Sequence, residues 1–252
     1  MLPSFDQTPD KPQSFGYKAS WFALRTSDPA AVADALALGR ATPANWESGL
    51  AAVHDAEPDD AWVFVSPPVK GWVLAASCGW PYPTAQDDDD CGMKFDALFQ
   101  RLMERFDDVQ FYGSNRVVDF VAWARGVNGK PIRSFAWAGS EGIVLINVGA
   151  QTAEEAKLRF ADLTGLSPPD AGDRIFEIAG ERDAEEKALV AKGLSLREAL
   201  AHIRQTGRKS FPDETDVLEL AALWSIDPMR LSDEDHPSGL GLAVRLPQDL
   251  AQ

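Results

Sequence analysis

Cysteine and histidine are scarce in this sequence, and their spacing excludes the commonest metal and redox sites. The 252 residues include only two cysteines, Cys78 and Cys91, whose separation of 13 positions fits neither a CxxC redox pair nor a zinc half-site. The three histidines, His54, His202 and His236, form no HxH, HxxxH or HExxH pattern. We therefore predict two reduced thiols, no bound metal and no cofactor.

Long apolar runs and nucleotide-binding motifs are also missing. No stretch approaches the roughly 18 uninterrupted apolar residues that a membrane-spanning helix needs. The first residues lack a basic start followed by an apolar run, so we expect no signal peptide and a cytoplasmic location. The glycine pairs at 139–142 and 239–241 match neither a phosphate-binding loop nor a GxSxG nucleophile elbow, and the first pair is typical of a hairpin turn.

Basic residues are outnumbered throughout the chain. There are 24 Lys and Arg against 39 Asp and Glu, which gives a formal charge of −15, and both halves of the sequence are acidic. Nucleic acids and anionic membrane surfaces are recognised mainly through Lys and Arg, so we expect neither as a partner. The charge favours a basic protein partner instead.

What the sequence does contain is the pattern of an α+β protein. Residues 1–17 are rich in Pro, Ser and Gln and are expected to form an extended arm, residues 18–165 an α+β core domain, and residues 166–252 a helical C-terminal segment packed on the core. Short runs rich in Val, Trp and Phe, bounded by Gly and Pro, predict strands joined by short connections. We expect an antiparallel sheet of about six strands with helices mainly on one face.

Several helices are indicated by periodicity and by capping residues. Six apolar residues between Phe95 and Phe106 recur at spacings of three and four, which predicts an amphipathic helix over the sheet. Thr152 with Glu155, and Ser195 with Glu198, have the spacing of capping boxes.

The segment WPYPTAQDDDDCG, which starts at Trp80, is the most unusual in the chain. Adjacent aspartates repel one another and are tolerated in water or where a cation or a basic partner offsets them. A solvated loop, a protein-binding loop and a metal site are the three interpretations, and the metal site is disfavoured because calcium loops alternate ligands with spacers. Rigid aromatic residues beside charges are typical of interface anchors. We therefore predict partner-binding residues at Trp80, Tyr82, Asp87, Asp88, Asp89 and Asp90.

Candidates for catalysis are few. His54 lies beside several carboxylates that could orient it as a general base, although a surface histidine in an acidic loop explains the same pattern. Arg116, Arg125 and Arg133 fall on neighbouring strands and could line a polar face that binds an anion or is simply hydrated. Cys78 ends a strand and has an apolar neighbourhood on one side, so we do not expect an activated thiol there. We assign no catalytic residue.

One block of residues carries a resemblance to a family. The segment from Asp216 to Pro228, which contains WSIDP, is similar to the C-terminal signature of a family of uncharacterised bacterial proteins. Their central sequence resembles Trp72–Leu74 and Arg116–Ala124 here, so that the likeness spans residues 60–228. Acidic proteins of this appearance include immunity proteins of bacterial toxin systems.

The resemblance implies a function in bacterial competition. The leading expectation is a non-enzymatic immunity protein that binds a cognate, basic antibacterial toxin or effector and occludes its active site. The alternatives are an enzyme with a small polar pocket, and an adaptor of a secretion system. The first would bind one toxin, the second needs polar groups that converge in a cavity, and the third would bind several components.

Overall fold

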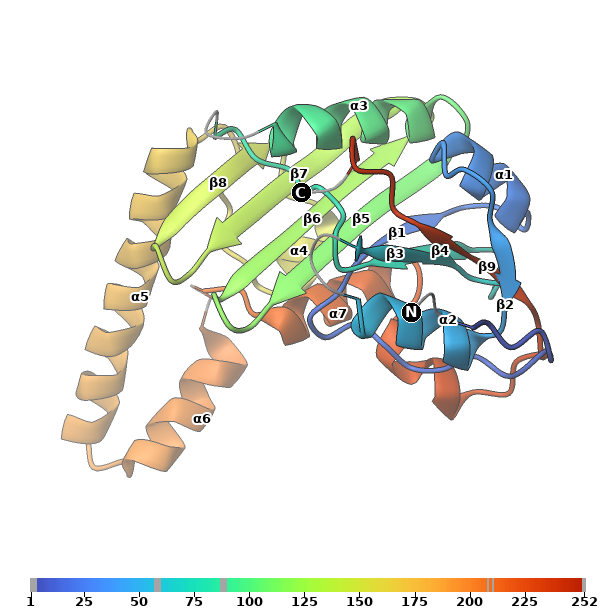
Figure 1. Cartoon of the computed structure of the whole chain (residues 1–252). Helices are drawn as coiled ribbons and strands as arrows, with labels where there is room; N and C mark the ends of the chain where they lie inside the picture. The colour runs from blue at the N-terminus through green and yellow to red at the C-terminus, as the bar shows by residue number, and fades with distance from the viewer. Residues whose placement is uncertain (1–3, 57–59, 87–89, 208, 210, 251–252) are drawn as a thin grey trace.

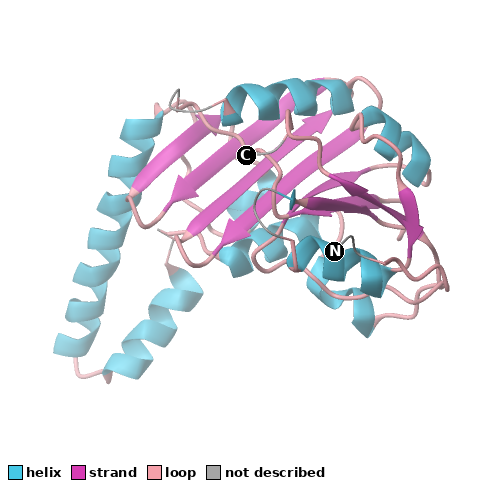
Figure 2. Ribbon diagram, in the orientation of Figure 1, coloured by secondary structure: helices cyan, strands magenta, loops and turns pink. Residues whose placement is uncertain are grey.

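The computed structural model describes residues 4–56, 60–86, 90–207, 209 and 211–250. They form one antiparallel sheet of nine strands with helices packed on both of its faces (Figures 1 and 2). The α+β class and the antiparallel pairing are confirmed. The expected number of about six strands is wrong. Helices lie on both faces, with more of them on one face than on the other.

The strands follow the spatial order β2-β9-β3-β4-β1-β5-β6-β7-β8. Every neighbouring pair is antiparallel. In chain order the strands are β1 (Ser20–Leu24), β2 (Thr42–Ala44), β3 (Trp62–Val65), β4 (Val73–Ser77), β5 (Asp108–Asn115), β6 (Phe120–Val127), β7 (Lys130–Ala138), β8 (Ile143–Val148) and β9 (Gly241–Arg245).

The helices cover both faces because the central strands are apolar on both sides. All five residues of β1 are buried, and alternate side chains of this strand enter opposite cores, Trp21 on one face and Phe22 on the other. Two helices pack on the Phe22 face: α1 (Pro29–Ala35) and α3 (Cys91–Met103). The Trp21 face is covered by elements that include α2 (Trp46–His54), α4 (Ala153–Lys157), α5 (Pro168–Ala191), α7 (Glu214–Trp224) and the 3-10 turn η2 (Pro228–Asp233).

The C-terminal segment is not only helical. Strand β9 lies between β2 and β3, with Ala243 opposite Thr42 on one side and Phe64 on the other. The segment therefore shares the sheet and both of its cores with the region predicted as the core domain, because Ala243 enters one core and Val244 the other. The described part of the N-terminal arm, residues 4–17, is extended and held against the body, because Asp10 accepts hydrogen bonds from the first backbone amides of α2 and Phe15 is buried.

Helix caps and tight turns form where the local residues favour them. Both capping boxes are present, on α4 and on α6 (Leu196–Thr206). Asn128 and Gly129 adopt positive φ in the turn between β6 and β7, as a tight hairpin requires. The β5–β6 and β7–β8 turns both lie at the opposite end of these strands. That end of the sheet, beside the base of α5, holds the hollows described next.

Candidate functional site

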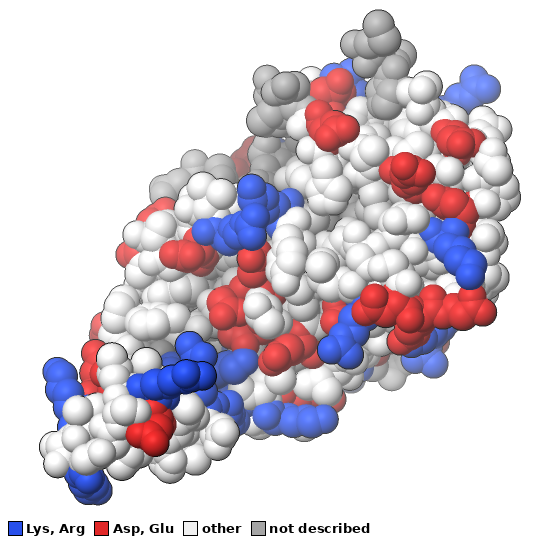
Figure 3. Space-filling view, turned by 90° about the horizontal axis from the view of Figure 1, so that it is seen from below, with Lys and Arg blue, Asp and Glu red and all other residues white. Residues whose placement is uncertain are grey.

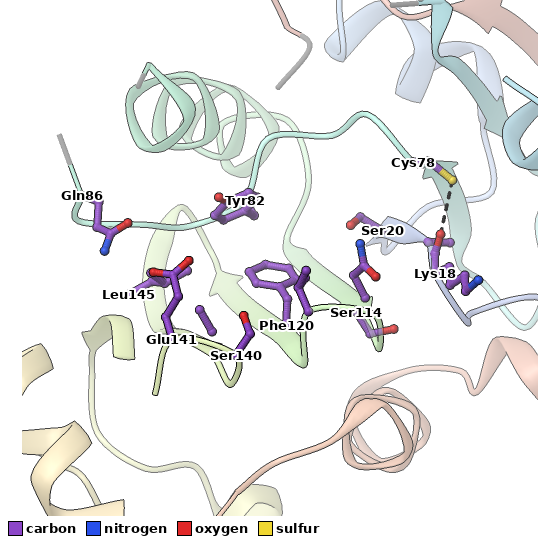
Figure 4. Close-up of a pocket in the computed structure, with 14 residues that line it drawn as sticks. Lys18, Ser20, Cys78, Tyr82, Gln86, Ser114, Phe120, Ser140, Glu141 and Leu145 are labelled. Carbon is purple, nitrogen blue, oxygen red and sulfur yellow. Dashed lines mark hydrogen bonds between the residues drawn. The ribbon is translucent and has the colours of Figure 1, made fainter. Parts of the chain in front are cut away.

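A polar cleft of about 360 Å³ opens at this end of the sheet. Its walls come from the start of β1, the end of β4, the β5–β6 and β7–β8 hairpins, and the segment that follows Trp80. Figure 4 shows this segment running across the cleft, with Tyr82 and Gln86 lying above the hairpin residues. Its polar lining includes Lys18, Ser20, Cys78, Ser114, Ser140 and Glu141.

The thiol in this cleft is not activated. The Sγ atom of Cys78 lies 3.3 Å from the carbonyl oxygen of Lys18, to which the S–H group donates (Figure 4). Cys78 is exposed in the wall of the cleft, but neighbouring atoms desolvate its sulfur and raise the pKa of the thiol, because the thiolate loses hydration. Cys91 is buried and accepts a hydrogen bond from the backbone N–H of Tyr82, so it fixes the start of the loop. The protonated thiol of Cys78 is a poor nucleophile.

Trp80 lies in the core and not on the surface. The indole is fully buried, its N–H donates to the carbonyl of Ala75 over 3.0 Å, and its ring contacts Phe22 at 5.4 Å. The expectation of an exposed aromatic anchor at Trp80 is therefore wrong. The physical reason is that the segment packs on the Phe22 face of the sheet. There the indole buries a large apolar area that would be exposed to water in a solvated loop.

The other predicted partner-binding residues separate into three groups. Tyr82 is half-buried and packs on Phe120, with ring centroids 4.7 Å apart, at the wall of the polar cleft. Asp90 is exposed at the start of α3, where its side chain makes no capping hydrogen bond. Asp87, Asp88 and Asp89 lie outside the described residues. A partner-binding role for Tyr82 and the aspartates stays a prediction.

A second hollow, which we call the aromatic pocket, lies next to the polar cleft and has a volume of about 630 Å³. Trp137 of β7, Phe176 of α5 and Phe211, which precedes α7, meet there with ring centroids 5.6 to 6.0 Å apart. Trp137 is buried, whereas Phe176 and Phe211 are 49% and 44% exposed. Phe120 lines both hollows, so the two form one continuous surface.

Carboxylates surround the aromatic pocket. Asp119 contributes from the β5–β6 turn, and Asp213 and Glu214 from the start of α7. Arg116 also lines the pocket and lies 3.8 Å from Oε1 of Glu214, too far for a hydrogen bond. The second oxygen of Glu214, Oε2, is buried without a hydrogen-bond partner among the described residues. The pocket thus combines π-faces with an excess of negative charge, which is the chemistry that holds a cation.

Sequence analysis missed Phe176 and Phe211, although one signal was present. The buried stripe of α5 contains Ala171, Ile175 and Ile178, which follow helical spacing. Phe176 falls beside this stripe, and a phenylalanine out of phase with the buried face of a helix indicates a surface contact. For Phe211 we find no comparable signal, because it lies in a connection whose position only the fold determines.

The predicted polar groups do not converge on one catalytic centre. Arg125 pairs with Asp108, Arg133 is buried against Glu155, and Arg116 lines the aromatic pocket, so the three arginines serve different places. His54 ends α2 and lines neither the polar cleft nor the aromatic pocket. Among the residues with described positions, no three His, Cys, Asp or Glu side chains are grouped so as to hold a metal ion.

Comparisons with known proteins and a search for spanning helices add two negative findings. No protein-family model, curated protein or solved structure matches this chain. Within the described ranges, no helix combines the length and the apolar character needed to cross a membrane. The inference of a function therefore depends on the geometry of the two hollows and on the charge of the chain.

Proposed function

We propose that this chain is an immunity protein, which binds a basic protein toxin and occludes its active site. The aromatic pocket is the centre of the docking surface in this proposal. The observation that carries it is the meeting of Trp137, Phe176 and Phe211 at 5.6 to 6.0 Å, with two of the rings half-exposed and carboxylates around them.

The chemistry of the pocket suits an arginine or lysine side chain of the toxin. A guanidinium group that stacks on the exposed faces of Phe176 and Phe211 lies close to the carboxylates that line the same pocket, Asp119, Asp213 and Glu214. Such a contact is worth more when water is excluded, and Trp137 forms a dry floor for it. Clustered aromatic residues with a charged rim are the usual composition of an interface hot spot.

The net charge adds a kinetic contribution. A protein with a formal charge of −15 attracts a basic partner over a distance of about one Debye length and raises the rate of encounter. Charges at the rim act mainly on the association rate, and buried anchors act mainly on the dissociation rate. We assign the first role to Asp119 and Asp213 and the second to the phenylalanines.

The residues that line the polar cleft favour binding over catalysis. Its thiol donates to a backbone carbonyl and has a raised pKa, and His54 is not among its lining residues. An enzyme needs a nucleophile or a base poised near the operating pH. The residues described in the cleft provide hydrogen-bonding surface, which suits a docking region beside the aromatic pocket.

The test is an affinity purification from the native host with the tagged wild-type chain and with a Phe176→Ala, Phe211→Ala variant. We expect one basic protein to elute with the wild type at near-equal stoichiometry and to be lost from the variant. For the purified pair, the variant should weaken the affinity on the order of 30-fold or more, as expected for an interface hot spot of ~2 kcal/mol.

Matched variants separate the aromatic contribution from the charge. Met93→Ala removes an apolar side chain that is 69% exposed on α3, and it should leave binding unchanged. Asp213→Asn keeps the N-cap of α7, because Asn caps as well as Asp does, and should slow association and reduce its dependence on salt. Full binding by the double phenylalanine variant would contradict the proposal.

A further inference from the structure

Helices α5 and α6 form a hairpin that projects from the body of the protein. Figure 1 shows α5 passing along the edge of the sheet next to β8 and then continuing beyond it, with α6 returning alongside. The last buried residue of α5 is Ile178, and none of the residues 179–191, all of which are described, is buried. At 1.5 Å per residue this outer part extends about 20 Å.

The apolar stripe of α6 is wider than α5 can cover. Leu196, Ala199, Leu200 and Ile203 have the spacing i, i+3, i+4, i+7 of a helix that buries a full face. Ala199 and Ile203 are buried, whereas Leu196 and Leu200, one turn apart on the same side, are 56% and 38% exposed. Val190 near the end of α5 is 42% exposed as well. Half of the stripe therefore lacks a covering helix within the described chain.

The two arms of the hairpin carry opposite charge. Residues 179–191 contain four acidic and two basic residues, and residues 192–207 contain three basic and one acidic residue. In Figure 3 the Lys and Arg side chains gather at the end of the molecule where the hairpin lies, and carboxylates are spread over the middle. One acidic arm and one basic arm of equal and opposite net charge make the hairpin complementary to itself.

We propose that a second copy of this chain docks on the hairpin, so that two hairpins form an antiparallel four-helix bundle. In this arrangement α5 of one copy covers the exposed stripe on α6 of the other, and the two-fold axis repeats the same contact. Acidic and basic helices then alternate around the bundle. Leu196, Leu200 and Val190 of both copies enter the shared core.

The length of the hairpin makes this contact compatible with the acidic bodies. Hairpins that overlap along their outer parts hold the two bodies about 20 Å apart. This separation exceeds the Debye length of ~8 Å at physiological ionic strength, so the repulsion between the bodies is screened. The aromatic pocket lies at the base of the hairpin, where only Phe176 of α5 contributes to it, and it is left open for a different partner.

Sedimentation velocity of the full chain between ~1 and ~100 µM tests the inference. We expect the wild type to pass from monomer to dimer over this range and a Leu196→Lys, Leu200→Lys variant to stay monomeric, with an unchanged circular dichroism spectrum because both positions are exposed. Met93→Lys, which alters an exposed apolar residue on α3, should dimerise like the wild type. A wild type that is monomeric at ~100 µM overturns the proposal.

A charge exchange distinguishes this bundle from other modes of association. An Arg197→Glu, Arg204→Glu variant and a Glu185→Lys, Glu186→Lys variant should each be monomeric, because like charges face one another in their own bundles. Mixed together they should form a heterodimer. One contact then joins a wild-type α5 to a wild-type α6, and the other joins a basic α5 to an acidic α6, so opposite charges face one another in both. Dimers of either variant alone, or binding of the wild type to phosphatidylglycerol vesicles without dimerisation, would contradict the inference.

Discussion

At the scale of single residues, the buried charges of this protein are structural. The guanidinium of Arg133 and the carboxylate of Glu155 are 4% and 2% exposed, and their atoms Nε and Oε1 lie 2.9 Å apart. Arg133 also donates to Asn147 and to a backbone carbonyl, and Trp123 donates to Glu155. Because the charges and donors are satisfied together, the network anchors α4 to the sheet.

Removing one partner of this network should cost more than removing both. Glu155→Gln leaves the guanidinium of Arg133 buried without its counter-charge, and we expect a loss of about 3 to 5 kcal/mol in the free energy of unfolding, measured with urea. The double variant Arg133→Met, Glu155→Leu buries no charge and should lose less. If Glu155→Gln were as stable as the wild type, the ion pair would have to be hydrated in the folded protein.

The positions of the aromatic residues show how much of the site could be predicted from the sequence. The pairing of aromatic residues with carboxylates was predicted, but at Trp80, whose indole proves to be buried. The pairing occurs at Phe176 and Phe211, which lie 35 positions apart and meet only because α5 and α7 both pack at one end of the sheet. The sequence indicates that aromatic and acidic residues form a surface site, but which of them lie together depends on the tertiary fold.

At the scale of elements, local signals predicted best where a helix or turn depends on its own residues. The apolar spacing from Phe95, the two capping boxes and the hairpin turn at 139–142 were all confirmed. Strands β2 and β9 were missed, because β2 has three residues and both are defined by pairing with distant chain. Which helices cover the second face was not predicted, since the alternation of side chains along a strand does not distinguish a hydrated face from one that a distant helix covers.

The capping box of α6 makes a prediction about pH. The carboxylate of Glu198 accepts hydrogen bonds from the hydroxyl and the backbone N–H of Ser195, which lower its pKa below the ordinary value of 4.5. A lowered pKa in the folded state stabilises the helix above pH 4.5, and this contribution is lost as the pH falls through the lowered value. We expect amide hydrogen exchange in α6 to accelerate over that range.

Glu198→Gln is the matched control for this prediction. A glutamine retains the shape of the capping box but does not titrate. At neutral pH the wild type should protect the amides of α6 better than the variant does, and in acid the difference should vanish. A constant difference between pH 7 and pH 3 would exclude a role for the Glu198 charge.

At the scale of the whole molecule, the sheet joins segments from both ends of the chain. Strand β9 pairs with β2 and β3, and its Ala243 is buried in the same core as Trp46 of α2 and Val217 of α7. Residues 18–165 and 166–252 therefore follow one another in sequence but fold into a single body that shares one sheet. We expect one cooperative unfolding transition.

A proline in β9 should test this dependence. Ala243→Pro removes a backbone donor from a strand with neighbours on both sides, so we expect a loss of about 3 kcal/mol or more in the free energy of unfolding, seen by fluorescence and circular dichroism alike. Gln248→Pro falls at the second position of the turn Pro247–Leu250, where proline is tolerated, and should be neutral. Equal stability of the two variants would mean that β9 is dispensable.

The position of β9 in the sheet also sets an order on biosynthesis. The strands from β4 through β1 to β8 can pair while the chain is still being made, but β3 keeps an open edge until the residues of β9 have left the ribosome. Open strand edges invite pairing with other chains. The nascent protein is therefore most vulnerable to aggregation in the interval between the synthesis of β3 and that of β9, and a chaperone that covers the β3 edge would protect it during that interval.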